Sequence, residues 1–205
     1  MVFYEQYINN QRIYVNSETK ARYPSVTTIT SQNSPFKGKP GNAAHIGTLI
    51  HWHILRQYAS GILPAPNVQI WGLSQAEVEG RIQRAITMWR NLHFDDQFTF
   101  VDVEALVVSD VHCYAGRADG IGMDNSGNIA VMDIKTGDFY PESYYMQGAA
   151  YAKAMGATSC YFVQLDVNDS RNPDQTGVVH HMGSQEIEKH FGEFKALLDA
   201  YHNKL

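Results

Sequence analysis

Between residues 98 and 135, three segments with the composition of β-strands follow one another, joined only by short turns. We expect strands near 98–109, 112–123 and 128–135, the last of them after the turn sequence Asp124-Asn125-Ser126-Gly127. Strands joined by tight turns pair antiparallel. Helical patterns flank this meander, and two further strands are expected near 159–166 and 176–182. This order of elements predicts an α/β fold with a central mixed sheet flanked by helices.

Two of these strands carry charged residues in otherwise apolar surroundings. Asp119 lies in an apolar row, where a carboxylate is costly unless it is paired or bound to a metal. Side chains alternate along a strand, so Asp133 and Lys135 should point to the same face. The carbonyl oxygen of Ile134 between them remains available as a metal ligand. Gly116, on the opposite face from Asp119, predicts the close approach of a ligand or of another backbone.

A helix is expected directly after the third strand, because Tyr140-Pro141-Glu142 places proline near a first helical turn. Gln147 and Tyr151 are four residues apart and share one face of that helix. They could hydrogen-bond a phosphate group, or water molecules beside a metal ion. Metal ions promote phosphodiester hydrolysis by lowering the pKa of bound water and neutralising phosphate oxygens. Magnesium prefers oxygen ligands, so the pattern predicts a metal-dependent phosphodiesterase site.

Taken in order, these residues resemble the PD-(D/E)XK nuclease superfamily in its RecB-like exonuclease branch. The family pattern is a histidine on an N-terminal helix, then Gly-x-x-Asp, then Asp/Glu-x-Lys, then Gln-x-x-x-Tyr. The chain supplies His51, Gly116 to Asp119, Asp133-Ile134-Lys135, and Gln147 to Tyr151. Residues 23–29, which include Pro-Ser-Val-Thr, look like a segment of mitochondrial genome maintenance exonucleases and their phage relatives. The resemblance spans residues 23–165 and implies a restriction-endonuclease-like core.

The resemblance implies three groups of site residues. The metal ligands for Mg²⁺ or Mn²⁺ would be His51, Asp119, Asp133 and the Ile134 carbonyl, with Glu104 on a second metal or beside the first. The catalytic residues would be Asp119, Asp133, Lys135, Gln147 and Tyr151, with Lys135 positioning or activating the attacking water. The DNA contacts would be Ser25, Thr27, Arg117, Thr136 and Tyr144. Gly47, one turn before His51, would leave room for a ligand.

The charge of the chain is a specific objection to a nucleic-acid substrate. The net charge is −5, whereas nucleic-acid binders usually carry a basic stripe. The charge is uneven, because residues 1–39 hold five basic and two acidic residues, or 5 − 2 = +3. The resemblance implies a DNA exonuclease acting on single strands or ends, and the uneven charge leads us to expect modest and salt-sensitive affinity. A structure-specific endonuclease of the same superfamily and an inactive nucleic-acid-binding module are the alternatives.

Length and composition favour one nuclease domain over residues 1–205, with residues 1–41 as an N-terminal extension that contacts substrate. No apolar run approaches the ~20 residues of a membrane span, and no secretory signal is apparent. Two cysteines, Cys113 and Cys160, fit a reducing cytoplasm. They exclude the four-cysteine iron–sulfur cluster of several RecB-like nucleases. By resemblance alone, the chain would suit a phage-encoded enzyme of DNA repair or recombination.

Overall fold

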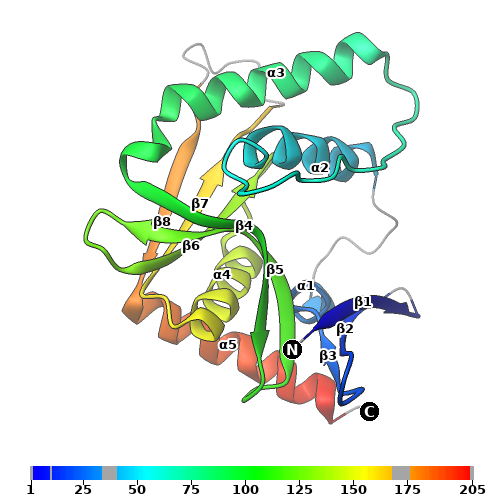
Figure 1. The fold of residues 1–205 in the computed structure, drawn as a ribbon, viewed down its shortest axis with the longest axis vertical. Helices are drawn as coiled ribbons and strands as arrows, with labels where there is room; N and C mark the ends of the chain where they lie inside the picture. The colour runs from blue at the N-terminus through cyan, green and yellow to red at the C-terminus, as the bar shows by residue number, and fades with distance from the viewer. Residues whose placement is uncertain (1, 10, 34–40, 168–175, 204–205) are drawn as a thin grey trace.

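The computed structural model describes residues 2–9, 11–33, 41–167 and 176–203 (Figure 1). Eight strands and five α-helices lie within these ranges, together with short 3-10 helices at Ser31–Asn33 and Phe94–Asp96. In chain order they are β1 (Phe3–Ile8), β2 (Gln11–Asn16), β3 (Arg22–Pro24), α1 (Val26–Thr30), α2 (Asn42–Leu55), α3 (Gln75–Leu92), β4 (Phe98–Ser109), β5 (Tyr114–Asp124), β6 (Ile129–Lys135), α4 (Pro141–Met155), β7 (Ser159–Gln164), β8 (Val178–Gly183) and α5 (Ser184–His202).

The central sheet has five strands in the order β4-β5-β6-β7-β8. The β4–β5, β5–β6 and β7–β8 pairs are antiparallel. The β6–β7 pair is parallel because α4 crosses between these two strands. The sheet is therefore mixed, and the predicted α/β class with a central mixed sheet is confirmed.

Helices cover both faces of this sheet (Figure 1). On one face, α2 and α3 pack their apolar stripes against strand residues such as Met132 and Ile134. On the other face, α1, α4 and α5 form a second core that includes Val131. Alternation along β6 therefore turns Asp133 and Lys135 toward α4, on the same side as Val131.

A smaller antiparallel sheet, in the order β1-β2-β3, lies beside the outer end of the β4–β5 hairpin (Figure 1). Two contacts attach it there. Ser25 forms an isolated parallel bridge to Ala115. The Tyr23 hydroxyl donates a hydrogen bond to Asp110 at 2.9 Å. The N-terminal segment is thus held against β5, the strand that carries Asp119.

The expected strand boundaries hold closely for the central sheet. The helix α2 has Gly41 as its N-cap. The Asn42 side chain bonds the backbone of Trp71, accepting from its N–H at 3.0 Å. The short helix α1 directly follows β3 and is capped by Ser25. Residues 34–40 and 168–175 lie outside the described residues. None of the described helices has the length and apolar character needed to cross a membrane.

Candidate active site

Three side chains from different elements converge on one point: His51 from α2, Glu104 from β4 and Asp119 from β5. One ligand atom from each lies within 4.8 Å of the others. His51 Nδ1 is 3.3 Å from Asp119 Oδ1, and the second carboxylate oxygen of Asp119 accepts a hydrogen bond from the Ile134 N–H at 2.7 Å. A nitrogen and carboxylate oxygens in this arrangement form a donor set suited to a divalent cation.

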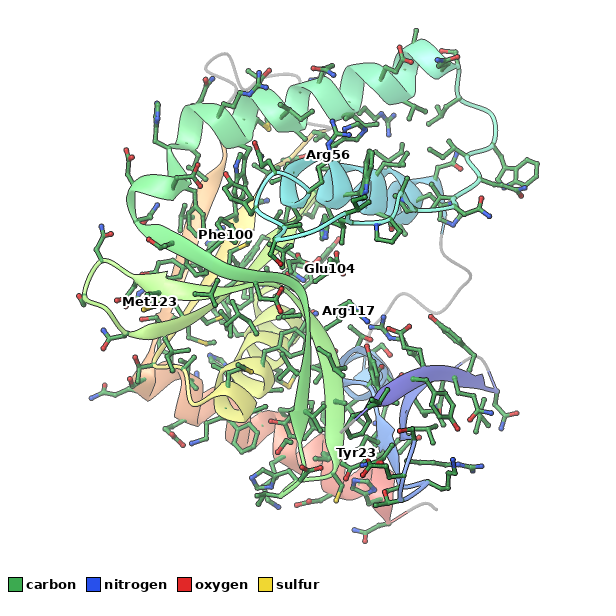
Figure 2. The ribbon with its side chains drawn as sticks, in the orientation of Figure 1. Tyr23, Arg56, Phe100, Glu104, Arg117 and Met123 are labelled. Atoms are coloured by element: carbon green, nitrogen blue, oxygen red, sulfur yellow. The ribbon has the colours of Figure 1, made fainter. Side chains whose placement is uncertain are left out.

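A local backbone irregularity brings Glu104 to this cluster. The β4–β5 register pairs Val103 with Gly120 and Ala105 with Ala118, which places Glu104 opposite Asp119. Glu104 has φ = +50°, a left-handed conformation that is uncommon outside glycine. Such strain is often kept at functional sites, where it sets the direction of a side chain. Figure 2 shows Glu104 at the centre of the molecule, between α2 and the N-terminal strands.

The three groups alter one another's protonation. Burial acts to raise the pKa of Asp119, but the charge of His51, their hydrogen bond and the Ile134 N–H lower it overall. Burial acts to lower the pKa of His51, but the charge of Asp119 raises it overall. Burial, followed by the negative charge of Asp119, raises the pKa of Glu104. Without a metal ion, His51 and Glu104 therefore tend to retain protons that a bound cation would displace, whereas Asp119 stays ionised.

Beside the cluster, a chain of polar contacts runs from β6 to α4. Lys135 forms an ion pair with Asp133, which confirms that the two share a face. Lys135 Nζ also donates to Gln147 Oε1 at 2.9 Å and lies 4.2 Å from the centre of the Tyr144 ring. Gln147 Nε2 in turn donates to the Tyr151 hydroxyl at 3.3 Å. The lysine is thus held in one place by three neighbours.

The Asp133–Lys135 pair is largely removed from water. The exposed fractions of the two side chains are 6% and 13%. Burial raises the pKa of Asp133, although Lys135 opposes that rise. For Lys135, burial acts to lower the pKa, but the charge of Asp133 raises it overall. Lys135 is therefore a charged donor at neutral pH.

An open cleft of about 480 Å³ leads to this pair. It lies between the first turns of α2 and α4 and the segment that joins β6 to α4. Its lining includes His51, Arg81, Lys135, Thr136 and Tyr144. A second hollow of about 230 Å³ is lined by Thr48, Trp52, Glu104 and Arg117, among others. Together the two hollows reach both sides of the three-residue cluster, since one includes His51 and the other Glu104.

The structure refines the expected metal ligands. His51, Glu104 and Asp119 come together, whereas Asp133 lies outside this group and pairs with Lys135. Ile134 contacts the cluster through its N–H group, and the expectation that its carbonyl oxygen and Asp133 bind the metal stays a prediction. Glu104, which sequence reasoning left between two roles, is placed with the ligand atoms.

The expected DNA contacts divide into two groups. Thr136 and Tyr144 line the cleft, and Arg117 lines the second hollow. Ser25 is buried and caps α1 by accepting a hydrogen bond from the Thr28 N–H, and its expected contact with DNA stays a prediction. Thr27, the remaining member, accepts a hydrogen bond from Arg12.

Two glycines of the site lie close to side chains. A Cβ on Gly47 would lie 2.9 Å from the Thr136 hydroxyl, and Gly47 also lines the 480 Å³ cleft, so the expectation that it leaves room for a ligand stays a prediction. A Cβ on Gly116 would lie 2.5 Å from the Tyr151 ring. Gly116 therefore allows the close approach of Tyr151 and not of a ligand or a backbone.

Comparison with known proteins gives the fold. No family model and no curated protein matches the chain. A crystal structure described as a "putative exonuclease" from Eubacterium rectale has a TM-score of 0.51 at 11% identity, over 89% of this chain and 76% of that one. The chain thus shares with that structure its α/β fold with a central mixed sheet flanked by helices. A structure of LHK-Exo in complex with dAMP gives a TM-score of 0.42 at 12% identity, over 88% and 91% of the two chains. The same alkaline exonuclease from Laribacter hongkongensis gives 0.39 at 13% identity, over 89% and 92%.

Proposed function

We propose that this protein is a metal-dependent deoxyribonuclease that hydrolyses phosphodiester bonds as an exonuclease, on single-stranded DNA or DNA ends. The observation that carries the proposal is the convergence of His51, Glu104 and Asp119 beside the buried Asp133–Lys135 pair. Two features of the molecule support it. The cleft at this point is open, so a polymer can enter it. The fold is shared with a protein described as an exonuclease.

His51, Glu104 and Asp119 would hold the metal ion, Mg²⁺ or Mn²⁺. When bound, the ion supplies an activated water and neutralises phosphate oxygens. Lys135 is fixed by Asp133 and Gln147 on the cleft wall. In this proposal, Lys135 orients the attacking water and stabilises the negative charge that develops on the phosphate.

The remaining residues of the polar chain would act by positioning. Gln147 links Lys135 to the Tyr151 hydroxyl, and Tyr151 is itself buried. They fix the lysine and support the phosphate side of the site. Tyr144 lies over the Lys135 ammonium and lines the cleft, so it is suited to stack on a base. We assign residues 1–205 to a single nuclease domain whose N-terminal segment, residues 1–41, contacts the substrate.

Cleavage of an end-labelled single-stranded DNA oligonucleotide tests this proposal. The reaction is run with Mg²⁺, Mn²⁺ or EDTA, beside a covalently closed single-stranded circle. Metal-dependent loss of the linear strand with an intact circle supports an exonuclease, and the product ladder gives its polarity. Linearisation of the circle would favour an endonuclease. No cleavage of DNA, RNA or branched duplexes with any metal would refute the proposal and favour a binding module.

A matched pair of variants connects the activity to the site. Lys135→Met removes a lysine that pairs with an aspartate in the cleft, and Lys195→Met removes one that pairs with Asp199 on the surface of α5. We expect Lys135→Met to lower kcat by at least about 100-fold, the scale of losing one electrostatic donor. Lys195→Met should cleave like the wild type. Equal activity of the two variants would contradict the assignment of Lys135.

A further inference from the structure

Arg12 on β2 is a partly buried cation that lacks an acidic partner. Its guanidinium donates a hydrogen bond to the Thr27 hydroxyl at 3.1 Å and lies 5.7 Å from the centre of the Tyr14 ring. Within the described residues, no carboxylate lies within ion-pair distance of Arg12. Removing a charge from water is costly unless an opposite charge or hydrogen bonds compensate. The position is therefore suited to an anionic ligand.

Tyr14, on the same strand, offers a hydroxyl group that is also unused. Its side chain is 1% exposed, and its hydroxyl has no hydrogen-bond partner among the described residues. Burial raises the pKa of Tyr14 to about 12, and the charges of Arg12, Glu5 and Arg117 act on the same hydroxyl. The hydroxyl therefore remains a protonated donor at neutral pH, on the strand position that is paired with Glu5.

Arg117 connects this position to the metal cluster. It donates one hydrogen bond to the Glu104 carbonyl at 2.5 Å, and its other terminal nitrogen lies 3.5 Å from Glu5 Oε1. It also lines the 230 Å³ hollow together with Glu104. Figure 2 shows Glu104 and Arg117 near each other, on the side of the site that faces the N-terminal strands.

The Glu5 carboxylate lies where an anion would be held. Glu5 pairs with Tyr14 in the β1–β2 register, which brings its side chain to this group of donors. The 3.5 Å separation from Arg117 is long for a charge-assisted hydrogen bond, which is usually 2.7–2.9 Å. About one third of each side chain in the pair is exposed to solvent. A partly exposed pair of this kind is weak and is readily exchanged for a stronger anion.

We propose that Arg12, Tyr14, Thr27 and Arg117 form a phosphate-binding site for the nucleic-acid backbone, next to the phosphate held at the metal cluster. In the free protein, the Glu5 carboxylate stands in for that phosphate at Arg117 only. The proposal rests on the proposed function, because the substrate is the same DNA strand. In this proposal, the N-terminal sheet binds the DNA strand directly, through two positive charges and two hydroxyl groups that lie together.

Binding of a fluorescent single-stranded oligonucleotide, measured by anisotropy in EDTA, tests the site without cleavage. Glu5→Gln removes the competing carboxylate, and we expect it to tighten binding by about fivefold, the scale of one exposed ion pair. Glu18→Gln is the matched control, since it removes the same charge from the exposed turn that follows β2. It should change the Kd by less than about twofold. If Glu5→Gln fails to bind more tightly than Glu18→Gln, Glu5 does not stand in for a phosphate.

Tyr14→Phe removes only the unused hydroxyl and keeps the shape of the core. Because that hydroxyl has no partner in the free protein, the thermal unfolding midpoint should not fall. Binding should nevertheless weaken by about fivefold, the value of one hydrogen bond to a charged group or slightly less. Arg12→Gln should weaken binding by about tenfold or more. Wild-type affinity in both variants would overturn the proposed site.

Oligonucleotides with one neutral methylphosphonate linkage, moved along the strand, identify the phosphate. At one position along the strand, the neutral linkage should weaken binding to the wild type. At that same position it should leave the already weaker binding to Arg12→Gln unchanged. Oligonucleotides with and without terminal phosphates distinguish a strand end from an internal position. If removal of a terminal phosphate weakens binding to the wild type but not to Arg12→Gln, the strand end and not an internal phosphate occupies the site. If the wild type neither binds nor cleaves DNA, the proposed function itself fails. If it cleaves DNA and the Glu5, Tyr14 and Arg12 variants bind like the wild type, only the phosphate site fails.

Discussion

The buried Asp133–Lys135 pair should lower the stability of the fold in exchange for a charged lysine in the cleft. Replacing a buried ion pair by apolar residues of similar volume is often neutral or stabilising, whereas removing one partner is strongly destabilising. We therefore consider three variants: Asp133→Val, Lys135→Met and the double substitution. Valine suits a strand interior, and methionine has nearly the length of lysine.

The contacts that remain set the size of each effect. Loss of one partner of a buried pair costs about 3–5 kcal/mol. In Asp133→Val, Lys135 keeps its bond to Gln147 at 2.9 Å and its contact with the Tyr144 ring at 4.2 Å. The cost should therefore lie near the lower value, about 3 kcal/mol. In Lys135→Met, Asp133 loses its only nearby cation on β6 and can respond by taking up a proton, since burial already raises its pKa. The double variant should unfold within about 1 kcal/mol of the wild type.

Urea denaturation in EDTA measures these free energies, because a bound metal ion would add its own stabilisation to the folded state. The interaction energy of the double-mutant cycle should be favourable by about 2 kcal/mol or more. All three variants should lack cleavage activity, so stability and activity separate in the double variant. If the double variant instead loses the sum of the two single costs, the pair is not an ionic unit that opposes stability, and this reasoning is wrong.

Three further predictions follow from the same site. Gly116→Ala should lower the free energy of unfolding by about 1–3 kcal/mol and reduce activity, since its Cβ would lie 2.5 Å from the buried Tyr151 ring. A thermal-shift assay measures the loss of stability. Gly192→Ala is the control and should be neutral or stabilising in that assay, because no atom lies within 4 Å of its Cβ. Asp119 raises the pKa of His51, so the ion pair between them adds to the stability of the fold. This contribution is fully present below pH 6.5 and is lost as the pH rises through the pKa of His51 in the folded state. In EDTA, the stability of the wild type relative to His51→Gln should therefore fall across that range, and a constant difference would argue against the pair. Mn²⁺ at 100 times its Kd should stabilise the wild type by about 2.7 kcal/mol, and an equal gain in Asp119→Asn would exclude Asp119 as a ligand.

Local sequence signals were sufficient for the central sheet and for the pair on β6. The predicted strand at 98–109 agrees with β4, and the predicted strand at 128–135 agrees with β6 to within one residue. These elements have clear periodicity and turn residues, and their packing does not override those signals. The shared face of Asp133 and Lys135 follows from strand alternation alone, so it too could be predicted.

The rest of the site depends on tertiary structure that a local pattern does not encode. The direction of Glu104 follows from a positive φ within β4, which no neighbouring glycine or turn signal indicates. Ser25 looks like a surface contact in sequence, yet its role as the N-cap of α1 buries it. In the sequence, Arg12 contributes only to the positive charge of residues 1–39, and Tyr14 belongs to no motif. Their importance appears when β2 is placed beside β5, more than 100 positions away in sequence.

The arrangement of charges explains how a chain with a net charge of −5 could bind a polyanion. Two carboxylates, Glu104 and Asp119, lie where the reacting phosphate would approach, and they would repel it in a metal-free site. A cation at the cluster would reverse that local sign, while Arg12 and Arg117 remain beside it with no acidic partner stronger than Glu5. Metal and nucleic acid should then bind with positive coupling, and linkage requires the effect to be reciprocal. The net negative charge of the chain would limit binding away from the cleft, so the affinity for DNA would depend on the loaded site.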